Sequence, residues 1–155
     1  MPTINGKVCV VDGVAVDKVF SNGKQVYGRN LLIGTSNELK TITVGGWGSS
    51  PTNNASGTYG AGRYYASAYI ENTTPVVMTV HVKVNGWGWN YSGDSIPAGQ
   101  SGIVNCTFDV LDGQSLNSAW VGFTSFQSEN YTYKYKEMMV KRALSTWTPA
   151  PEDVM

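Results

Sequence analysis

The sequence predicts an all-β protein, an antiparallel β-sandwich with a jelly-roll-like strand order, preceded by a small N-terminal β-hairpin segment. Short apolar runs alternate with polar residues at a period of two, and no segment sustains the 3.6-residue period of a helix. Turn-forming residues separate these runs at intervals typical of a sandwich. The composition agrees, since 18 glycines with abundant Thr, Ser, Asn and Tyr favour strands and turns.

Length and charge limit the classes of function. A chain of 155 residues is long enough for one core but too short for two full domains. Eleven basic and eleven acidic side chains balance, so we expect neither a nucleic-acid nor a membrane partner. No apolar run approaches the length of about 18 residues that crosses a membrane. Residues 1–13 lack the pattern of a signal peptide, so we expect synthesis in a cytosol.

Residues 1–29 are predicted to form an N-terminal β-hairpin docking segment. Asp12-Gly13 and Asn22-Gly23 are typical two-residue hairpin turns between apolar runs. The three short strands expected around these turns are Lys7–Val11, Val14–Ser21 and Lys24–Tyr27. These strands hold too few apolar residues for a stable fold. The segment is therefore expected to dock on the main body, on a partner or on another copy of the chain.

Residues 30–147 are predicted to form the sandwich, and residues 148–155 an extended tail held by Trp147. The strands of the sandwich are expected at Asn30–Gly34, Thr41–Val44, Arg63–Asn72, Val76–Asn85, Gly102–Leu111, Ala119–Ser128 and Thr132–Ala143. The stretch from Gly45 to Gly62 is almost free of aliphatic side chains, so we expect an exposed, functional loop there and no contribution to the core.

Alternation within the strands predicts which side chains face the core. The run after Pro75 has an apolar face formed by Val76, Met78, Val80, Val82 and Val84. Its other face is predicted to be wet and carries Val77, Thr79, His81, Lys83 and Asn85. Two further buried faces are expected, formed by Tyr64, Ala66, Ala68 and Ile70 and by Val104, Cys106, Phe108 and Val110. Another face, carrying Tyr131, Tyr133, Tyr135, Glu137 and Met139, forms either a sheet-packing surface or a protein interface.

The two cysteines and the Asn-x-Ser/Thr sites can each be interpreted in two ways. Cys9 and Cys106 are predicted to be buried thiols in a reducing compartment, and a disulfide between them is the alternative. Five Asn-x-Ser/Thr sites occur, at Asn54, Asn72, Asn90, Asn105 and Asn130. Because no signal peptide is expected, we attribute these sites to a composition rich in Asn and Thr and not to glycosylation.

Catalysis and cofactors are not expected. The chain has a single histidine and lacks the sequence motifs of hydrolases, zinc enzymes, thiol oxidoreductases and phosphate-binding loops. A glycosidase needs two carboxylates placed across a sugar, and nothing selects such a pair from Glu71, Asp94, Asp109, Asp112 and Glu137. No metal site is predicted; a structural calcium ion at Asp94 or Asp109, completed by backbone carbonyls, is the only alternative.

Carbohydrate binding fits the exposed aromatic residues. A pyranose presents an apolar C–H face and a rim of hydroxyls, which a flat aromatic ring and nearby amides or acids complement. The candidate binding residues are Trp47, Arg63, Trp87, Trp89, Asn90, Tyr91 and Asp94. The alternative for each loop tryptophan is a lid over the end of the sandwich. A groove on a polar sheet face, formed by Tyr65, Tyr69, His81 and Lys83, is a second candidate, whereas Trp120 is expected in the core.

Several motifs resemble carbohydrate-binding-module-like domains in the tail proteins of phages that infect lactobacilli and related Gram-positive bacteria. These motifs are Gly28-Arg29-Asn30-Leu31-Leu32, Tyr69-Ile70-Glu71-Asn72-Thr73, Ile96-Pro97-Ala98-Gly99, Tyr135-Lys136-Glu137-Met138-Met139-Val140 and Trp147-Thr148-Pro149-Ala150-Pro151-Glu152-Asp153. Residues 19–27 resemble the leader of small tail proteins from the same phages. The family often has Glu-x-Gly and Ala-Thr-Asp before the tryptophan, where this chain has Lys141-Arg142-Ala143 and Leu144-Ser145-Thr146.

The resemblance implies a jelly-roll sandwich on the phage tail tip or baseplate that binds host cell-wall saccharides. It implies no binding residues, because the shared motifs belong to the scaffold. The expected partners are wall polysaccharide and other tail or baseplate proteins, and the expected location is the virion, with homo-oligomerisation left open. The alternatives are a purely structural tail subunit without a ligand and, third, a small cell-wall glycoside hydrolase.

Replacing Trp89 by Ala is predicted to abolish retention of the protein on host cell walls while leaving the melting temperature nearly unchanged. A loop ring that stacks on sugar contributes to binding but little to folding. A wall-retention assay paired with thermal melts checks this, and either surviving retention or a collapsed fold contradicts it.

Overall fold

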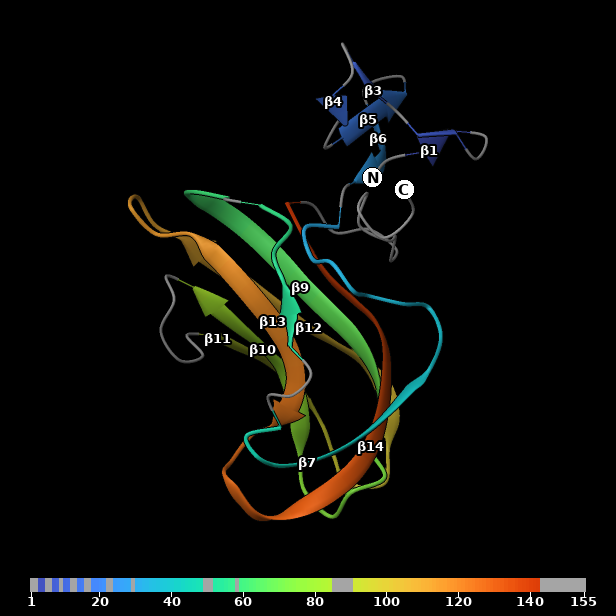
Figure 1. Ribbon diagram of the computed structural model, residues 1–155, viewed down its shortest axis with the longest axis vertical. Helices are drawn as coiled ribbons and strands as arrows, with labels where there is room; N and C mark the ends of the chain where they lie inside the picture. Colours follow the sequence, from blue (N-terminus) through green and yellow to red (C-terminus); the bar gives the residue numbers. More distant parts are fainter. Residues whose placement is uncertain are drawn as a thin grey trace.

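Two four-stranded antiparallel sheets form the body of the protein in a computed structural model (Figure 1). The structure describes residues 30–48, 52–57, 59–84 and 91–142 in full, and the backbone of the strands before residue 29. The strands of the body are β7 (Lys40–Gly46), β8 (Asn53–Asn54), β9 (Gly62–Glu71), β10 (Met78–Val84), β11 (Tyr91–Ile96), β12 (Ser101–Val110), β13 (Leu116–Phe123) and β14 (Gln127–Lys141). This confirms the predicted all-β sandwich.

The strand order is that of a jelly roll. One sheet, called sheet I, has the order β11-β10-β13-β8, and sheet II has the order β12-β9-β14-β7. From β7 to β14, every connection crosses from one sheet to the other except the one between β10 and β11. Eight strands arranged in this way, four in each layer, form the double-sheet architecture expected from the sequence.

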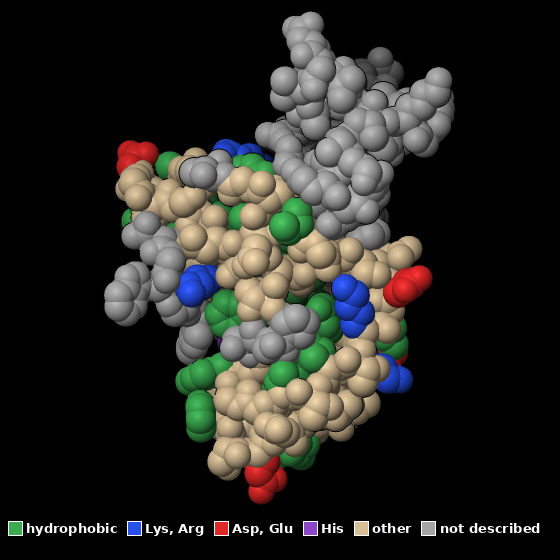
Figure 2. Space-filling model, in the orientation of Figure 1, with side chains coloured by type: hydrophobic (Ala, Val, Ile, Leu, Met, Phe, Trp, Pro, Cys, Tyr) green, Lys and Arg blue, Asp and Glu red, His purple; other side chains and the backbone are tan. Residues whose placement is uncertain are grey.

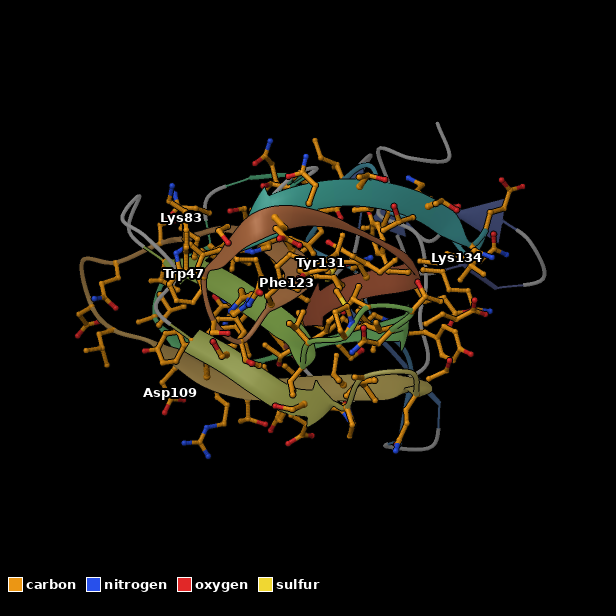
Figure 3. The ribbon with its side chains drawn as sticks, turned by 90° about the horizontal axis from the view of Figure 1, so that it is seen from below. Trp47, Lys83, Asp109, Phe123, Tyr131 and Lys134 are labelled. Carbon is orange, nitrogen blue, oxygen red and sulfur yellow. The ribbon has the colours of Figure 1, made fainter. Side chains whose placement is uncertain are left out.

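The core lies between the two sheets and contains the apolar faces predicted from alternation. Its fully buried members include Met78, Val80, Val82, Val104, Phe108, Tyr64, Ile70, Phe123 and Tyr133. The rings of Phe123 and Tyr131 meet edge to face at 6.0 Å, and Figure 3 shows both in the interior. Burial of these side chains supplies the main free energy of folding. Tyr131, Tyr133 and Tyr135 therefore form a sheet-packing surface.

The backbones of the two sheets approach each other closely where β11 passes β12. Gly93 of β11 lies so near the carbonyl of Asn105 that a Cβ at this position would overlap it. Close by, the ring of Tyr91 packs against Phe108 at 5.4 Å, and its hydroxyl donates to the backbone oxygen of Asp109 at 2.8 Å. A residue without a side chain is needed for this approach of two backbones.

Asn72 joins the end of β9 to the turn after β11. Its side-chain nitrogen donates to the backbone oxygens of Val76, Ile96 and Pro97 at 2.7, 3.1 and 3.1 Å. Its side-chain oxygen accepts from both the amide and the hydroxyl of Thr74. With only 1% of Asn72 exposed, these bonds satisfy backbone groups that would otherwise be buried without partners. The same burial removes this asparagine as a glycosylation acceptor in the folded protein.

Asn30 makes a similar connection between the start of the body and β14. Its side-chain nitrogen donates to Met138 O at 3.1 Å, and its side-chain oxygen accepts from the amides of Leu32 and Val140. The first motif of the sandwich and the motif in β14 are thus in direct contact. Four of the motifs that carry the resemblance meet at two buried asparagines, so they are scaffold motifs, as expected.

A β-bulge in β14 corrects the predicted face of this strand. Lys136 pairs with Tyr69 and Met139 with Ser67, so β14 has one extra residue between them. Glu137 takes a left-handed conformation there, with φ of 55°, and its amide donates to Ser36 O at 2.7 Å. The extra residue reverses the alternation. Met138 and Val140 therefore enter the core after the three tyrosines, and the prediction that Glu137 and Met139 share the tyrosine face was wrong.

Three predicted segments differ from the structure. Asn30–Gly34 is not a strand and makes only an isolated bridge from Leu32 to Ala55. The stretch from Gly45 to Gly62 contains β8, with Asn53 buried and Ala55 packed against the core, so it is not entirely a loop. The predicted strand from Ala119 to Ser128 is interrupted by a turn at residues 124–126. In the second case two asparagines pair with β13 at the border of a sheet, where alternation of apolar residues is absent.

The part of residues 1–28 that the structure describes contains six short strands in three antiparallel pairs. These are β1 (Thr3–Ile4) with β2 (Lys7–Val8), β3 (Val10–Val11) with β4 (Val14–Ala15), and β5 (Lys18–Ser21) with β6 (Lys24–Gly28). The last two pairs flank Asp12-Gly13 and Asn22-Gly23, so both predicted hairpins are confirmed. The predicted three-stranded meander is replaced by separate pairs.

Cys106 is a buried free thiol, as predicted for one of the two cysteines. Burial, followed by the nearby charge of Asp94, raises the pKa of this thiol to about 11. Cys9 lies outside the described residues. Among the residues that the structure describes, no helix is long and apolar enough to cross a membrane.

Replacing Asn72 by Ala is expected to lower the free energy of unfolding by about 3 kcal/mol, because several buried backbone groups lose their partners. Asn105→Ala is the matched control, because Asn105 is an exposed asparagine of β12. Chemical denaturation of the two variants checks this. Equal stabilities would mean that Asn72 does not join the turn to the sheet.

Candidate functional site

A tight turn at the end of β7 positions Trp47. The amide of Gly48 donates to Gly45 O at 2.9 Å, and Gly46 adopts a φ of +60°, which favours glycine at this place in a turn. The carbonyl of Trp47 accepts from the amide of Phe123 at 3.2 Å. The turn is therefore fastened to the end of β13, and it leaves the indole of Trp47 half-buried at the border of the sandwich.

The turn between β13 and β14 presents Phe126 beside this indole. Phe126 has 65% of its surface exposed, the largest fraction among the exposed large hydrophobic side chains of the described residues. Its ring meets that of Trp47 edge to face, with centroids 6.3 Å apart and planes at 71°. We call Trp47 and Phe126 the aromatic corner. An exposed ring held in a short turn between two strands is available for stacking without further ordering.

Polar side chains surround the aromatic corner. The side-chain amide nitrogen of Gln127 donates to the carbonyl and the hydroxyl of Ser125, both at 3.0 Å. Asn130 is exposed and lies next to Gly45, while Glu129 is the one acidic residue of the segment 124–130. Charged side chains are also sparse over the face of the molecule shown in Figure 2. The corner thus offers hydroxyls, amides and one carboxylate, which suits neutral polar ligands.

The outer face of sheet I is buried next to the Trp47 turn, which corrects the predicted wet face of β10. Thr79 and His81 have 0% and 1% of their surface exposed, and Ser118 and Trp120 of β13 have 4% and 5%. The rings of His81 and Trp120 are in contact at 5.3 Å. The predicted burial of Trp120 is confirmed, but the residue contacts His81 outside the core between the sheets. Among the described residues, its buried indole nitrogen finds no hydrogen-bond partner.

Gly122 makes room for the contacts between β10, β13 and the Trp47 turn. A Cβ at Gly122 would overlap the carbonyl oxygen of Trp47 and would lie 3.2 Å from the His81 ring and 3.1 Å from the Trp120 nitrogen. The ring of His81 passes beside Gly122. Its Nε2 donates to Phe123 O at 2.7 Å, and its Nδ1 contacts the hydroxyl of Ser92 at 2.8 Å. Burial lowers the pKa of His81 from 6.5, and the Phe123 carbonyl offsets part of that change.

The described candidates of the sequence analysis do not form one site. Tyr91 pairs with Val82, whereas the Trp47 turn lies beside Phe123, which pairs with Met78. Four residues along β10 separate these positions, or about 13 Å. Trp87, Trp89 and Asn90 lie outside the described residues.

Each remaining candidate has a defined place. Arg63 forms a bidentate ion pair with Asp109, at 2.8 and 3.0 Å, and both side chains are largely exposed. Asp94 is exposed on β11, and its backbone oxygen accepts from the Thr79 hydroxyl. Tyr91, as described above, is engaged between β11 and β12. Of the seven predicted residues, Trp47 is the described one that lies in an exposed aromatic cluster.

The predicted groove on a polar sheet face does not exist. Tyr65 and Tyr69 belong to β9 in sheet II, whereas His81 and Lys83 belong to β10 in sheet I. The ammonium group of Lys136 lies over the Tyr69 ring, at 5.3 Å from its centroid. The two tyrosines and the His81–Lys83 pair therefore belong to different sheets and do not line one groove.

The carboxylates are dispersed. Glu71 lies 4.0 Å from Lys134, and Glu137 lies 3.7 Å from Lys136. Among the described residues, no group of three or more His, Cys, Asp or Glu side chains is placed to hold a metal ion. Neither Asp94 nor Asp109 gathers further acidic ligands for calcium in this part of the chain.

Phe126 is the residue that the sequence analysis missed. The predicted strand Ala119–Ser128 placed it within regular structure, although Ser125 next to it and the polar residues after it are typical of a turn. A large apolar residue flanked by Ser and Gln in such a turn was the available indication.

No protein-family model matches the chain, and no curated protein matches it. Among solved structures, the chain is similar to the C-terminal domain of EclA, described as a sugar-binding protein. The two share 11% sequence identity with a TM-score of 0.44, over 69% of this chain and 81% of that chain. A likeness at this level carries no argument about what the chain binds.

Replacing Gly122 by Ala is expected to move the Trp47 turn and to lower the free energy of unfolding by about 1–3 kcal/mol, as overpacking does. Hydrogen exchange at the Phe123 amide, which donates to Trp47 O, should become faster. Gly60→Ala is the control, because, apart from its two chain neighbours, no described residue has an atom within 4 Å of a Cβ at Gly60. An unchanged Phe123 amide in Gly122→Ala would contradict this account of the turn.

Proposed function

We propose that the protein is a non-catalytic saccharide-binding module of a phage tail or baseplate, and that the aromatic corner contacts the sugar. The observation that carries the proposal is the pairing of the exposed Phe126 ring with the half-buried Trp47 indole. Stacking on the C–H face of a pyranose removes apolar surface of both partners from water. The hydroxyl of Ser125 and the amides of Gln127 and Asn130 suit the rim of the sugar.

The geometry favours one sugar ring at the corner over a run of stacked rings. The two aromatic planes stand at 71°, so a flat chain of pyranoses cannot lie on both faces at once. Glu129 is the one charged residue of the segment 124–130, and its carboxylate repels anions. The ligand class we propose is a neutral sugar at a chain end or a branch of the wall polysaccharide.

The tail location rests on the resemblance of the scaffold motifs. The paired strands of residues 1–28 are proposed to dock on another tail protein, because short isolated hairpins are marginally stable alone. Many copies on one virion would raise the effective concentration of weak sites. No cofactor is included in the proposal, and the loop with Trp87 and Trp89 remains a predicted second contact.

Replacing Phe126 by Ala is expected to weaken binding to neutral host-wall polysaccharide about tenfold. Burying one such ring contributes about 1.5 kcal/mol, which corresponds to roughly this factor in Kd. The melting temperature should stay nearly constant, because the side chain is largely exposed. Calorimetric titration with purified wall oligosaccharide measures the change.

Leu111→Ala is the matched control, because Leu111 is similarly exposed, at 60%, and lies after β12. It should bind like the unmodified protein. Absence of binding at any valency would instead support a purely structural tail subunit, and release of reducing ends from the polysaccharide would support a hydrolase.

A further inference from the structure

We infer that His81 positions the Trp47 turn, and that acid releases this turn and weakens ligand binding at the aromatic corner. The part concerning ligand binding rests on the proposed function; the movement of the turn does not. The backbone amide and the backbone carbonyl of Phe123 both form hydrogen bonds here. Its amide donates to Trp47 O at 3.2 Å, and its carbonyl accepts from His81 Nε2 at 2.7 Å.

The imidazole and the turn share the space above Gly122. The carbonyl of Trp47 and the His81 ring both approach the Cα hydrogen side of this glycine, so the position of one limits the other. The opposite ring nitrogen of His81 contacts Ser92, and Trp120 covers one side of the ring. His81 is therefore fixed between β11, β13 and the Trp47 turn.

Few charged groups lie on the described elements that pack against His81. Lys83 lies two residues along β10, and Asp94 lies on β11. Strand β13 presents Ser118, Trp120 and Gly122 on this face, and the turn at residues 45–48 has no titratable side chain. An imidazolium ion with 1% exposure would be largely removed from water.

Linkage sets the direction of the effect. Burial lowers the pKa of His81 below 6.5 while the turn is closed, and admission of water to an open turn restores the ordinary pKa. The state with the higher pKa is favoured as pH falls, so acid favours the open turn. The closed turn is favoured above pH 6.5 and progressively less as pH falls through the lowered pKa of the closed state.

The test compares the unmodified protein with His81→Gln, whose side-chain amide keeps a donor for Phe123 O and does not titrate. Amide protection factors are measured from about pH 7.5 to about pH 5.5, the range in which histidine titrates. We expect the Phe123 amide of the unmodified protein to lose protection at the acid end, and that of His81→Gln to stay constant. The Asn72 amide, which donates to Gln100 O, reports global opening and should not change.

Ligand binding is measured in parallel with purified neutral wall oligosaccharide. Its affinity should fall several-fold at the acid end for the unmodified protein and stay constant for His81→Gln. A Phe123 amide that responds in a protein without saccharide binding would refute the proposed function and keep the positioning role. Phe123 protection that is independent of pH, or equal loss at Asn72, would overturn the role of His81.

Discussion

Hydrogen bonds from two buried asparagine side chains hold the irregular segments of the sandwich to its strands. A carboxamide has two donor hydrogens and an acceptor oxygen, so it can satisfy backbone groups where a β-ladder has ended. Asn72 does this beside Val76, Ile96 and Pro97, and Asn30 does it along β14. Both asparagines lie in the motifs Asn30-Leu31-Leu32 and Tyr69–Thr73, and their contacts serve the architecture of the sandwich.

Most of the fold follows from the alternation of apolar side chains. The sequence predicts the buried faces of β9, β10 and β12 because apolar side chains recur at every second position along each of these strands. Alternation fails where the second face is buried as well, as at His81, since polarity alone does not reveal that another segment covers it. It also fails at β8, where two asparagines pair with a strand and no apolar pattern marks the pairing.

The candidate site was predictable only in part. Trp47 was identified because glycines on both sides indicate a turn. Phe126 was missed because the predicted strand Ala119–Ser128 continued through the turn that holds it, and the contact with Trp47 comes from a distant part of the chain. The grouping of distant loops was not available from the sequence, since the crossing connections of a jelly roll decide which loops meet at the same end of the molecule.

The extra residue at Glu137 divides β14 into two parts that differ in which alternate positions face the core. Tyrosines at odd positions fill the core before it, and Met138 and Val140 at even positions fill it afterwards. If β14 instead continued in strict alternation through Glu137, without the bulge, Met138 and Val140 would turn away from the core. The bulge thus reconciles two apolar patterns of opposite parity within one strand, and a relative that keeps the tyrosines, the methionine and the valine at this spacing should preserve it even where little of the sequence is shared.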